Sequence, residues 1–118
     1  WEAAMSASKF NSNNLIAIVD NNKVAQDNMT EDLKSIEPLE DKWNSFGWDV
    51  HRIDGHNMRD IMNTLSLPIH SNKPRVIIAD TIKGKGVSFR EGDKGWHGVA
   101  PKEEDFNRAL KELERQND

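Results

Sequence analysis

The chain contains no cysteine, no long apolar run and no excess of positive charge. Without cysteine, disulfides, thiolate nucleophiles and cysteine-based zinc sites are excluded. No apolar stretch approaches the ~18–20 residues of a membrane span, and no signal peptide is recognisable. The net charge of −4 argues against a general nucleic-acid binder, which normally carries a basic face. We therefore expect a soluble, cytoplasmic protein that binds neither nucleic acid nor membranes.

What is present fits one small domain. A length of 118 residues predicts a single domain, and an apolar content of 36% predicts a thin core. The first residues already follow a helical pattern, in which Trp1, Ala4, Met5 and Ser8 share one face. A natural chain would begin with Met or a polar segment, so we expect a piece of a larger protein that starts inside a helix.

Three segments predict β-strands. The run 15–19 is continuous and apolar, which is typical of a strand buried on both faces of a parallel sheet. The segment 48–53 is more polar, which favours a place nearer an edge. The segment 75–79 is a third apolar strand. Each segment is followed by an aspartate: Asp20, Asp54 and Asp80.

Helical signals alternate with these strands. Pro38 suits the first turn of a helix that ends at Gly47, and Asn57 can cap the next helix. The acidic residues from Glu103 onward favour the start of a last helix. Between the third strand and that helix, residues 81–101 show no periodicity. The apolar stripes of the three helices are Leu39, Trp43 and Phe46; Met58, Ile61, Met62 and Leu65; and Phe106, Ala109, Leu110 and Leu113.

This alternation predicts an α/β fold, with a partial parallel sheet and helices on both faces. Sheets of this kind bind ligands at the carboxyl ends of their strands. The segments in which to look for a site are therefore 20–24, 54–57 and 81–97.

Two of these segments carry residue types suited to a phosphorylated ligand. Residues 20–24 offer Asp and Asn side chains and turn carbonyls, which are hard oxygen ligands for Mg²⁺ or Ca²⁺, although an ordinary turn uses the same residues. Residues 82–87 combine two glycines with two lysines, which suits either a loop that approaches a phosphate or a solvated loop. We expect residues 83–95 to be the most mobile interior stretch, because only Val87 and Phe89 anchor it.

The histidines give no metal signature. Neither H-x₃-H nor H-E-x-x-H occurs, so zinc is not expected, and no G-x-S-x-G elbow occurs. We expect His51 to be exposed, His56 to lie within reach of a site, and His70 to lie in a loop between prolines. His97 lies in the long loop, where it is either a ligand contact or a surface residue.

Six stretches together resemble transketolase. Each is weak alone, but they occur in the family's order at compatible spacing and cover almost the whole chain. The resemblance is closest to the N-terminal subunit of the split bacterial or archaeal enzymes. The stretches are Trp1–Met5, Asn14–Asp20 with Asn22–Lys23, Asp41–Trp43 with Phe46–Trp48, Asp54–His56, Thr81–Phe89 and Trp96–Gly98.

The resemblance implies a domain that holds thiamine diphosphate through Mg²⁺. By position, Asn22 is similar to the side-chain ligand of the metal, and Val24 to the residue that offers its carbonyl. Ile82 is similar to an apolar residue packed near the cofactor. His97 is similar to the catalytic histidine that faces the cofactor diphosphate and the bound substrate. Glu2 is similar to a glutamate of a carboxylate network at the dimer interface.

The sequence also departs from the family pattern. Gln26 followed by Asp27-Asn28 stands where the family has an apolar residue and Asp-Gly. The Gly-Asp-Gly motif that carries the metal's aspartate does not occur. The glutamate that activates the aminopyrimidine belongs to a separate domain. We therefore interpret residues 1–118 as a partial thiamine diphosphate-binding (PP-type) domain that lacks its N-terminal half.

The resemblance implies that the parent protein is a transferase that moves a two-carbon ketol unit between sugar phosphates, as in the pentose phosphate pathway. The expected partners are sugar phosphates, the pyrimidine-binding domain or C-terminal subunit of transketolase, and further copies in a dimer or other homo-oligomer. We expect the isolated chain to be inactive and to hold the cofactor weakly. Two alternatives stay open: a sister enzyme such as a deoxyxylulose-phosphate synthase, and a catalytically silent α/β fragment that holds no cofactor.

Overall fold

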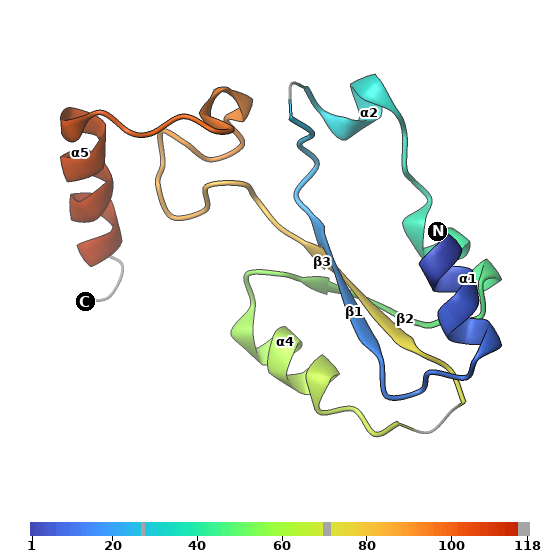
Figure 1. Ribbon diagram of the computed structural model, residues 1–118. Coiled ribbons are helices and arrows are strands. Elements are labelled where there is room, and N and C mark those ends of the chain that lie inside the picture. The colour runs from blue at the N-terminus through green and yellow to red at the C-terminus, as the bar shows by residue number, and fades with distance from the viewer. Residues whose placement is uncertain (27, 70–71, 116–118) are drawn as a thin grey trace. The chain divides into compact units, whose positions relative to one another are not determined.

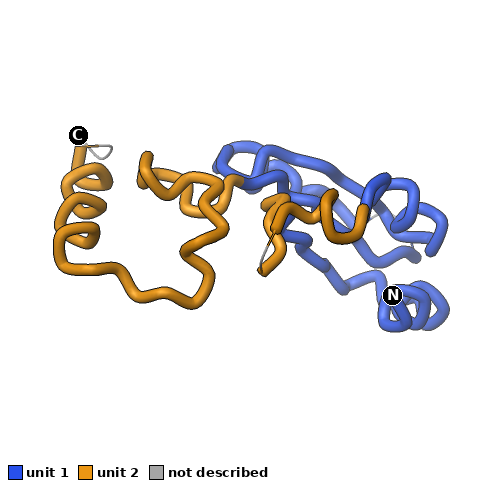
Figure 2. The backbone as a smooth tube through the Cα atoms, turned by 90° about the horizontal axis from the view of Figure 1, so that it is seen from above, with its two compact units in different colours: residues 1–21, 36–81 blue, residues 22–35, 82–118 orange. Residues whose placement is uncertain are grey.

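The computed structural model describes residues 1–26, 28–69 and 72–115 (Figure 1). The chain divides into two compact units (Figure 2). Unit 1 comprises residues 1–21 and 36–81, and unit 2 comprises residues 22–35 and 82–118. Within the described ranges, no helix is long and apolar enough to cross a membrane.

Unit 1 is built on a parallel sheet with the strand order β1–β3–β2. These strands span Ile16–Asn21 (β1), Asp49–Asp54 (β2) and Arg75–Asp80 (β3). Asn21 and Asp54 both pair with Asp80, so the three strands end level with one another. The predicted α/β class, the parallel direction and the edge position of the second strand are confirmed.

One face of the sheet carries the main core. Helices α1 (Glu2–Lys9) and α3 (Leu39–Ser45) pack there, and the indole Nε1 of Trp48 donates a 2.9 Å hydrogen bond to the Ala4 carbonyl. Trp1 and Met5, which were predicted to share one helix face with Ala4, are 51% and 49% exposed, because the helix turns its small alanines toward the sheet. The buried residues of this core are Ala4, Ala7, Leu39, Trp48, Val76 and Ile78.

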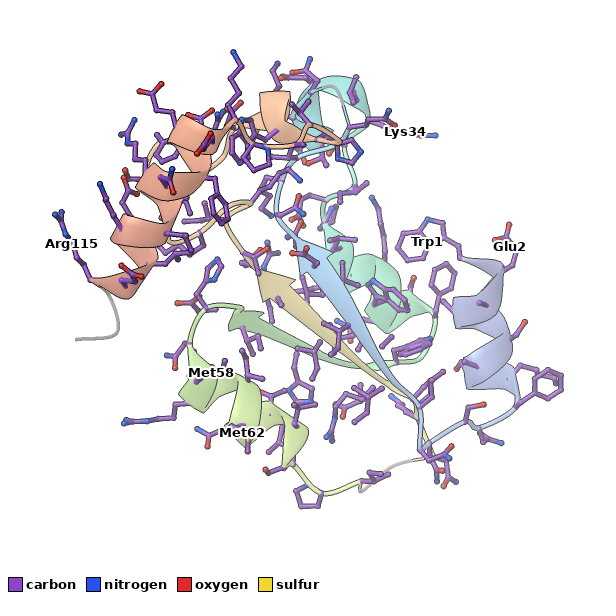
Figure 3. All side chains as sticks on the ribbon, turned by 60° about the vertical axis from the view of Figure 1, so that its left-hand side comes forward. Trp1, Glu2, Lys34, Met58, Met62 and Arg115 are labelled. Carbon is purple, nitrogen blue, oxygen red and sulfur yellow. The ribbon has the colours of Figure 1, made fainter. Side chains whose placement is uncertain are left out.

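The opposite face carries α4 (Met58–Leu65) (Figure 1). Asn57 caps this helix as predicted, since its side chain accepts hydrogen bonds from two backbone amides of the first turn. Met58 and Met62 belong to the predicted apolar stripe, but they are 72% and 61% exposed (Figure 3). An apolar cavity of about 220 Å³ remains between α4 and the sheet. Its lining includes Ile18, Ile53, Ile61, Leu65, Ile77 and Ala79.

The first strand is less buried than its sequence predicts. Its continuous apolar run predicts burial on both faces, but within the described residues β1 is an edge strand that pairs with β3 alone. Ile18 is 65% exposed, whereas Ile77, its partner in register, is 2% exposed. An apolar run shows that a strand can be buried, but it does not show which neighbours surround it. The central place in the sheet belongs to β3.

As far as the structure describes it, unit 2 consists of loops, two one-turn helical segments and one longer helix. The one-turn helix α2 (Thr30–Leu33) and the 3₁₀-helix η1 (Lys94–Trp96) were not predicted, whereas α5 (Glu103–Glu114) begins at the predicted residue. Among the residues of unit 2 that the structure describes, no hydrophobic side chain is fully buried. This unit therefore lacks a core comparable with that of unit 1.

An ion pair joins β2 and β3 at the amino end of the sheet. Arg75 is 7% exposed, and its Nε donates a 2.8 Å hydrogen bond to Asp49 Oδ2. His51 Nε2 lies 3.1 Å from Asp49 Oδ1, so the half-buried His51 is not the exposed residue we expected. Burial opposes the ionisation of Asp49, but the hydrogen bonds from Arg75 and His51 outweigh it. The pKa of this carboxyl therefore lies below its usual value.

The paired isoleucines of β1 and β3 test the strand order. We expect Ile77→Ala to lower the free energy of unfolding by about 2–4 kcal/mol, because it removes a side chain buried at the centre of the sheet. The matched Ile18→Ala change on the edge strand should cost less than about 1 kcal/mol. Urea denaturation measures both values. Equal losses would contradict the placement of β1 at the edge.

Asp49 makes stability depend on pH. A carboxyl whose folded pKa is lowered stabilises the fold above its unfolded pKa of about 3.9, and this contribution is lost as the pH falls through the folded value. We expect Asp49→Asn to cost about 1 kcal/mol at neutral pH, because the carboxylate is partly exposed. The difference from the parent chain should shrink in strong acid. A pH series of urea denaturations checks this, and a loss that is the same at every pH would contradict it.

Candidate functional site

A polar network holds together the carboxyl end of the sheet in unit 1. Asp80, the last residue of the central strand, accepts hydrogen bonds from Asn21 Nδ2 and from Arg52 Nε, both at 2.7 Å. Asn21 is only 3% exposed. Because Asn21 belongs to β1 and Arg52 to β2, one carboxylate joins the ends of all three strands.

Arg52 also fixes the chain that leads into α3. Its guanidinium donates a 3.1 Å hydrogen bond to Glu37 Oε1, while Glu37 Oε2 accepts a bond from the Leu39 amide at the start of the helix. Hydrogen bonds to Asp80 and Glu37 raise the pKa of Arg52 above its already high value. The sequence does not predict this role for Arg52, because a single cation in a polar strand is equally typical of a solvated edge.

Steric crowding explains why position 55, between Asp54 and His56, is a glycine. A Cβ atom on Gly55 would lie 2.4 Å from Thr81 Cγ2 and 3.1 Å from the Asp80 carbonyl oxygen. The turn after β2 therefore passes too close to the end of β3 for a side chain. The His56 amide donates a 2.9 Å hydrogen bond to Asp54 Oδ1, and the His56 residue is exposed.

The predicted metal ligands lie together in a tight turn of unit 2. The Val24 amide donates a 2.9 Å hydrogen bond to Asn22 Oδ1, and Lys23 between them has a φ of 63°. Val24 forms an antiparallel bridge with Met29, flanked by hydrogen bonds from the Thr30 amide to the Lys23 carbonyl and from the Ala25 amide to the Asn28 carbonyl. The turn is therefore closed by its own backbone.

This bridge determines where the Val24 carbonyl points. In an antiparallel pair whose flanking residues make the hydrogen bonds, the N–H and C=O of the paired residue both point away from the partner strand. The Val24 amide points to Asn22 Oδ1, so the Val24 carbonyl lies on that same side of the turn. Two oxygen atoms, one from a side chain and one from the backbone, thus share one side of the turn.

These two oxygens suit part of a Mg²⁺ site but not all of it. Mg²⁺ takes oxygen ligands, and it is normally held by at least one carboxylate. Asn22 and Val24 contribute neutral oxygens only. Among the residues that the structure describes, no group of three or more His, Asp or Glu side chains could hold a metal ion. The two oxygens are therefore of the type that Mg²⁺ binds, but they lack the negative charge of a carboxylate.

The other two predicted cofactor residues also belong to unit 2. Ile82 is 42% exposed at the start of the long loop, and His97 is exposed directly after η1. Lys94 Nζ donates a 2.9 Å hydrogen bond to Asn28 Oδ1, which links the turn that holds Asn22 and Val24 to the loop that holds His97. The structure thus brings Asn22 and Val24 together and connects their turn to the His97 loop.

The long loop has more anchors than its composition predicts. The Gly92 amide donates a 2.8 Å hydrogen bond to the Lys83 carbonyl. Gly84 has a φ of 75°, and a Cβ on it would lie 2.7 Å from the Arg90 carbonyl oxygen. Val87 and Phe89 are therefore not its only anchors. High mobility of this stretch stays a prediction.

Glu2 belongs to unit 1, whereas the residues assigned to the cofactor belong to unit 2. It is the first residue of α1, and Figure 3 shows its side chain at the start of that helix. The carboxylate is 95% exposed and lies 3.3 Å from the Trp1 amino group. This exposure leaves it accessible to another chain.

Nearly the whole chain matches one protein family. The family described as "Transketolase, thiamine diphosphate binding domain" matches residues 1–117. A subunit of an apulose-4-phosphate transketolase from Actinobacillus succinogenes is 42% identical over 113 residues, which are 96% of this chain and 41% of that protein. A subunit of a 6-deoxy-6-sulfo-D-fructose transketolase from a Clostridium species is 44% identical over 117 residues, which are 98% of this chain and 42% of that protein.

Solved structures agree with this match. The crystal structure of transketolase from Campylobacter jejuni superposes with a TM-score of 0.87 at 29% identity, and covers 96% of this chain but 18% of that one. The chain thus spans about two fifths of the curated relatives and less of the solved one. The resemblance to transketolase, and to the N-terminal subunit of its split forms, is confirmed: the chain belongs to the family of the thiamine diphosphate binding domain of transketolase.

Proposed function

We propose that this chain supplies the metal-binding turn and the diphosphate-facing loop of a transketolase active site. The observation that carries the proposal is the shared direction of Asn22 Oδ1 and the Val24 carbonyl, in a turn that directly follows the level ends of the sheet. Open parallel sheets bind ligands at this edge. The turn would bind Mg²⁺, and Mg²⁺ would bind the cofactor diphosphate.

Each of the other assigned residues has its own task in this proposal. Ile82 presents an apolar side chain to the cofactor, and its 42% exposure leaves it accessible for that contact. His97 faces the diphosphate and the substrate, where its imidazole can donate a hydrogen bond to a phosphate or sugar oxygen. Thiamine diphosphate, when bound, supplies the carbanion chemistry that transfers a two-carbon unit. The chain's own residues bind the cofactor and orient it.

The proposed metal site needs a negative charge that the oxygens of Asn22 and Val24 do not supply. Dehydrating Mg²⁺ for two neutral oxygens alone is unfavourable, so the proposed site needs a carboxylate in addition to Asn22 and Val24. The resemblance to the family assigns that carboxylate to the Gly-Asp-Gly motif in the N-terminal half of the domain. The relatives that are named as transketolase subunits imply a second subunit. We propose that this partner provides the pyrimidine-binding part of the site. Glu2, exposed at the start of α1, would lie at an interface between copies.

Unit 1 has apolar surface for such assembly. The edge strand leaves Ile18 65% exposed beside the 220 Å³ cavity, and Met58 and Met62 are exposed on the helix that borders it (Figure 3). An exposed apolar strand edge beside an apolar cavity is the kind of surface that a partner can cover. The substrates we propose are ketose and aldose phosphates. Relatives named for apulose 4-phosphate and for a sulfo-sugar indicate that the individual sugar varies within the family.

Calorimetric titration of the isolated chain with thiamine diphosphate and Mg²⁺ tests the charge argument. We expect no saturable binding in the micromolar range, because a lost carboxylate ligand costs several kcal/mol of metal affinity. Asn22→Ala and Asn44→Ala are the matched variants, since both remove an amide but Asn44 lies on the exposed face of α3.

Two outcomes would contradict the proposal in different ways. Micromolar binding that Asn22→Ala abolishes and Asn44→Ala preserves would show that no outside carboxylate is needed, while supporting the assigned turn. Micromolar binding that neither variant changes would contradict the turn as well.

A further inference from the structure

Arg90 lies among aromatic rings and carboxylates in the long loop. Its guanidinium carbon lies 3.4 Å from the centroid of the Trp96 ring and 5.2 Å from that of Phe89. Its terminal nitrogens donate to Asp93 Oδ2 at 3.0 Å and to Asp105 Oδ2 at 3.2 Å. The side chain is 19% exposed, so these interactions are only partly screened by water. A solvated surface arginine would not have this environment.

These contacts tie three parts of unit 2 to one residue. Asp93 precedes η1, Trp96 is the last residue of η1, and Asp105 lies in the first turn of α5. Asp93 Oδ1 also accepts a 2.8 Å hydrogen bond from the Gly95 amide, which caps η1. Arg90 therefore holds both ends of η1 and joins them to the last helix.

The same short helix is held from another direction. Lys94, its first residue, donates to Asn28 in the turn that contains Asn22 and Val24. His97 follows Trp96 directly, so its backbone position is set by η1. The guanidinium of Arg90 and the ammonium of Lys94 together fix the position of the backbone that leads into His97.

We propose that Arg90 is a positioning residue that sets the place of His97 through Trp96. The inference rests on the role proposed above for His97. A planar guanidinium can stack on an indole while its edge donates to two carboxylates, and a lysine ammonium cannot do both. Arg90 thus orders the segment 93–97 before any ligand is present.

Arg108 provides a matched control. Its guanidinium carbon lies 4.1 Å from the centroid of the Phe89 ring, and its Nε lies 3.6 Å from Glu112 Oε1. It therefore combines a ring contact with an ion pair, as Arg90 does. Its side chain is 59% exposed, and these two contacts involve neither η1 nor Asp93.

Amide hydrogen exchange of the full chain, read by NMR, tests the placement without a ligand. We expect Arg90→Gln to speed exchange of the 95–98 amides by about tenfold, because a cation–π contact and charge-assisted hydrogen bonds are lost together. Arg90→Lys should give an intermediate value, and Arg108→Gln should leave these amides unchanged. In the parent chain the Arg90 Nε–H resonance should show the upfield ring-current shift of a stacked guanidinium. Unchanged exchange in Arg90→Gln, or equal changes in both glutamine variants, would overturn the proposal.

A second measurement separates this inference from the proposed function. Titration of the full chain with millimolar thiamine diphosphate and Mg²⁺, followed through the His97 resonances, detects weak binding. We expect Arg90→Gln to weaken the response severalfold and Arg108→Gln to leave it unchanged. If Arg90→Gln frees the 95–98 amides but leaves the response intact, the positioning role is overturned. If His97 does not respond even in the parent chain, its proposed cofactor role fails, and the exchange data alone decide the claim about Arg90.

Discussion

The carboxylate of Asp80 is the point on which the carboxyl end of the sheet depends. It terminates the central strand, and it accepts hydrogen bonds from the last residue of β1 and from an arginine of β2. Asn21 is almost fully buried, so its amide would be costly to leave without this acceptor. The three strands consequently end level, and the chain leaves β1 and β3 from fixed points. Every residue assigned to the cofactor lies in a segment that starts from one of these two ends.

The two units are stabilised by different physical means. Unit 1 has a buried aliphatic and indole core, in which Val76 and Ile78 are completely inaccessible to water. The described part of unit 2 has no fully buried hydrophobic side chain, and it is held by closed turns, ion pairs and the stacking of Arg90 on Trp96. Polar contacts at partly exposed sites contribute less each than core packing does. The unit that carries the assigned ligand residues is therefore the one whose conformation costs least to adjust.

The sequence predicts what depends on local pattern and fails where neighbours decide. Strand alternation, the Asn57 cap and the level carboxyl edge follow from apolar runs and turn residues, and the structure confirms them. The run 15–19 is as apolar as a central strand, yet its burial depends on which strands flank it. The sequence does not predict the roles of Arg52 and Arg90 for a related reason. An isolated arginine in a sequence is typical of solvent exposure, and only the folded chain shows carboxylates and rings gathered around it.

The candidate metal site is preorganised in geometry and incomplete in charge. Asn22 and Val24 are held by a turn that closes on itself, so their oxygens need no rearrangement to face one side. Preorganised dipoles reduce the cost of binding a cation, but they do not replace the Coulomb attraction of a carboxylate for Mg²⁺. The packing of unit 1 is incomplete as well, because Ile18 is exposed beside an apolar cavity. On the proposed function, the association that supplies a carboxylate to the Asn22 turn makes cofactor binding and assembly thermodynamically linked.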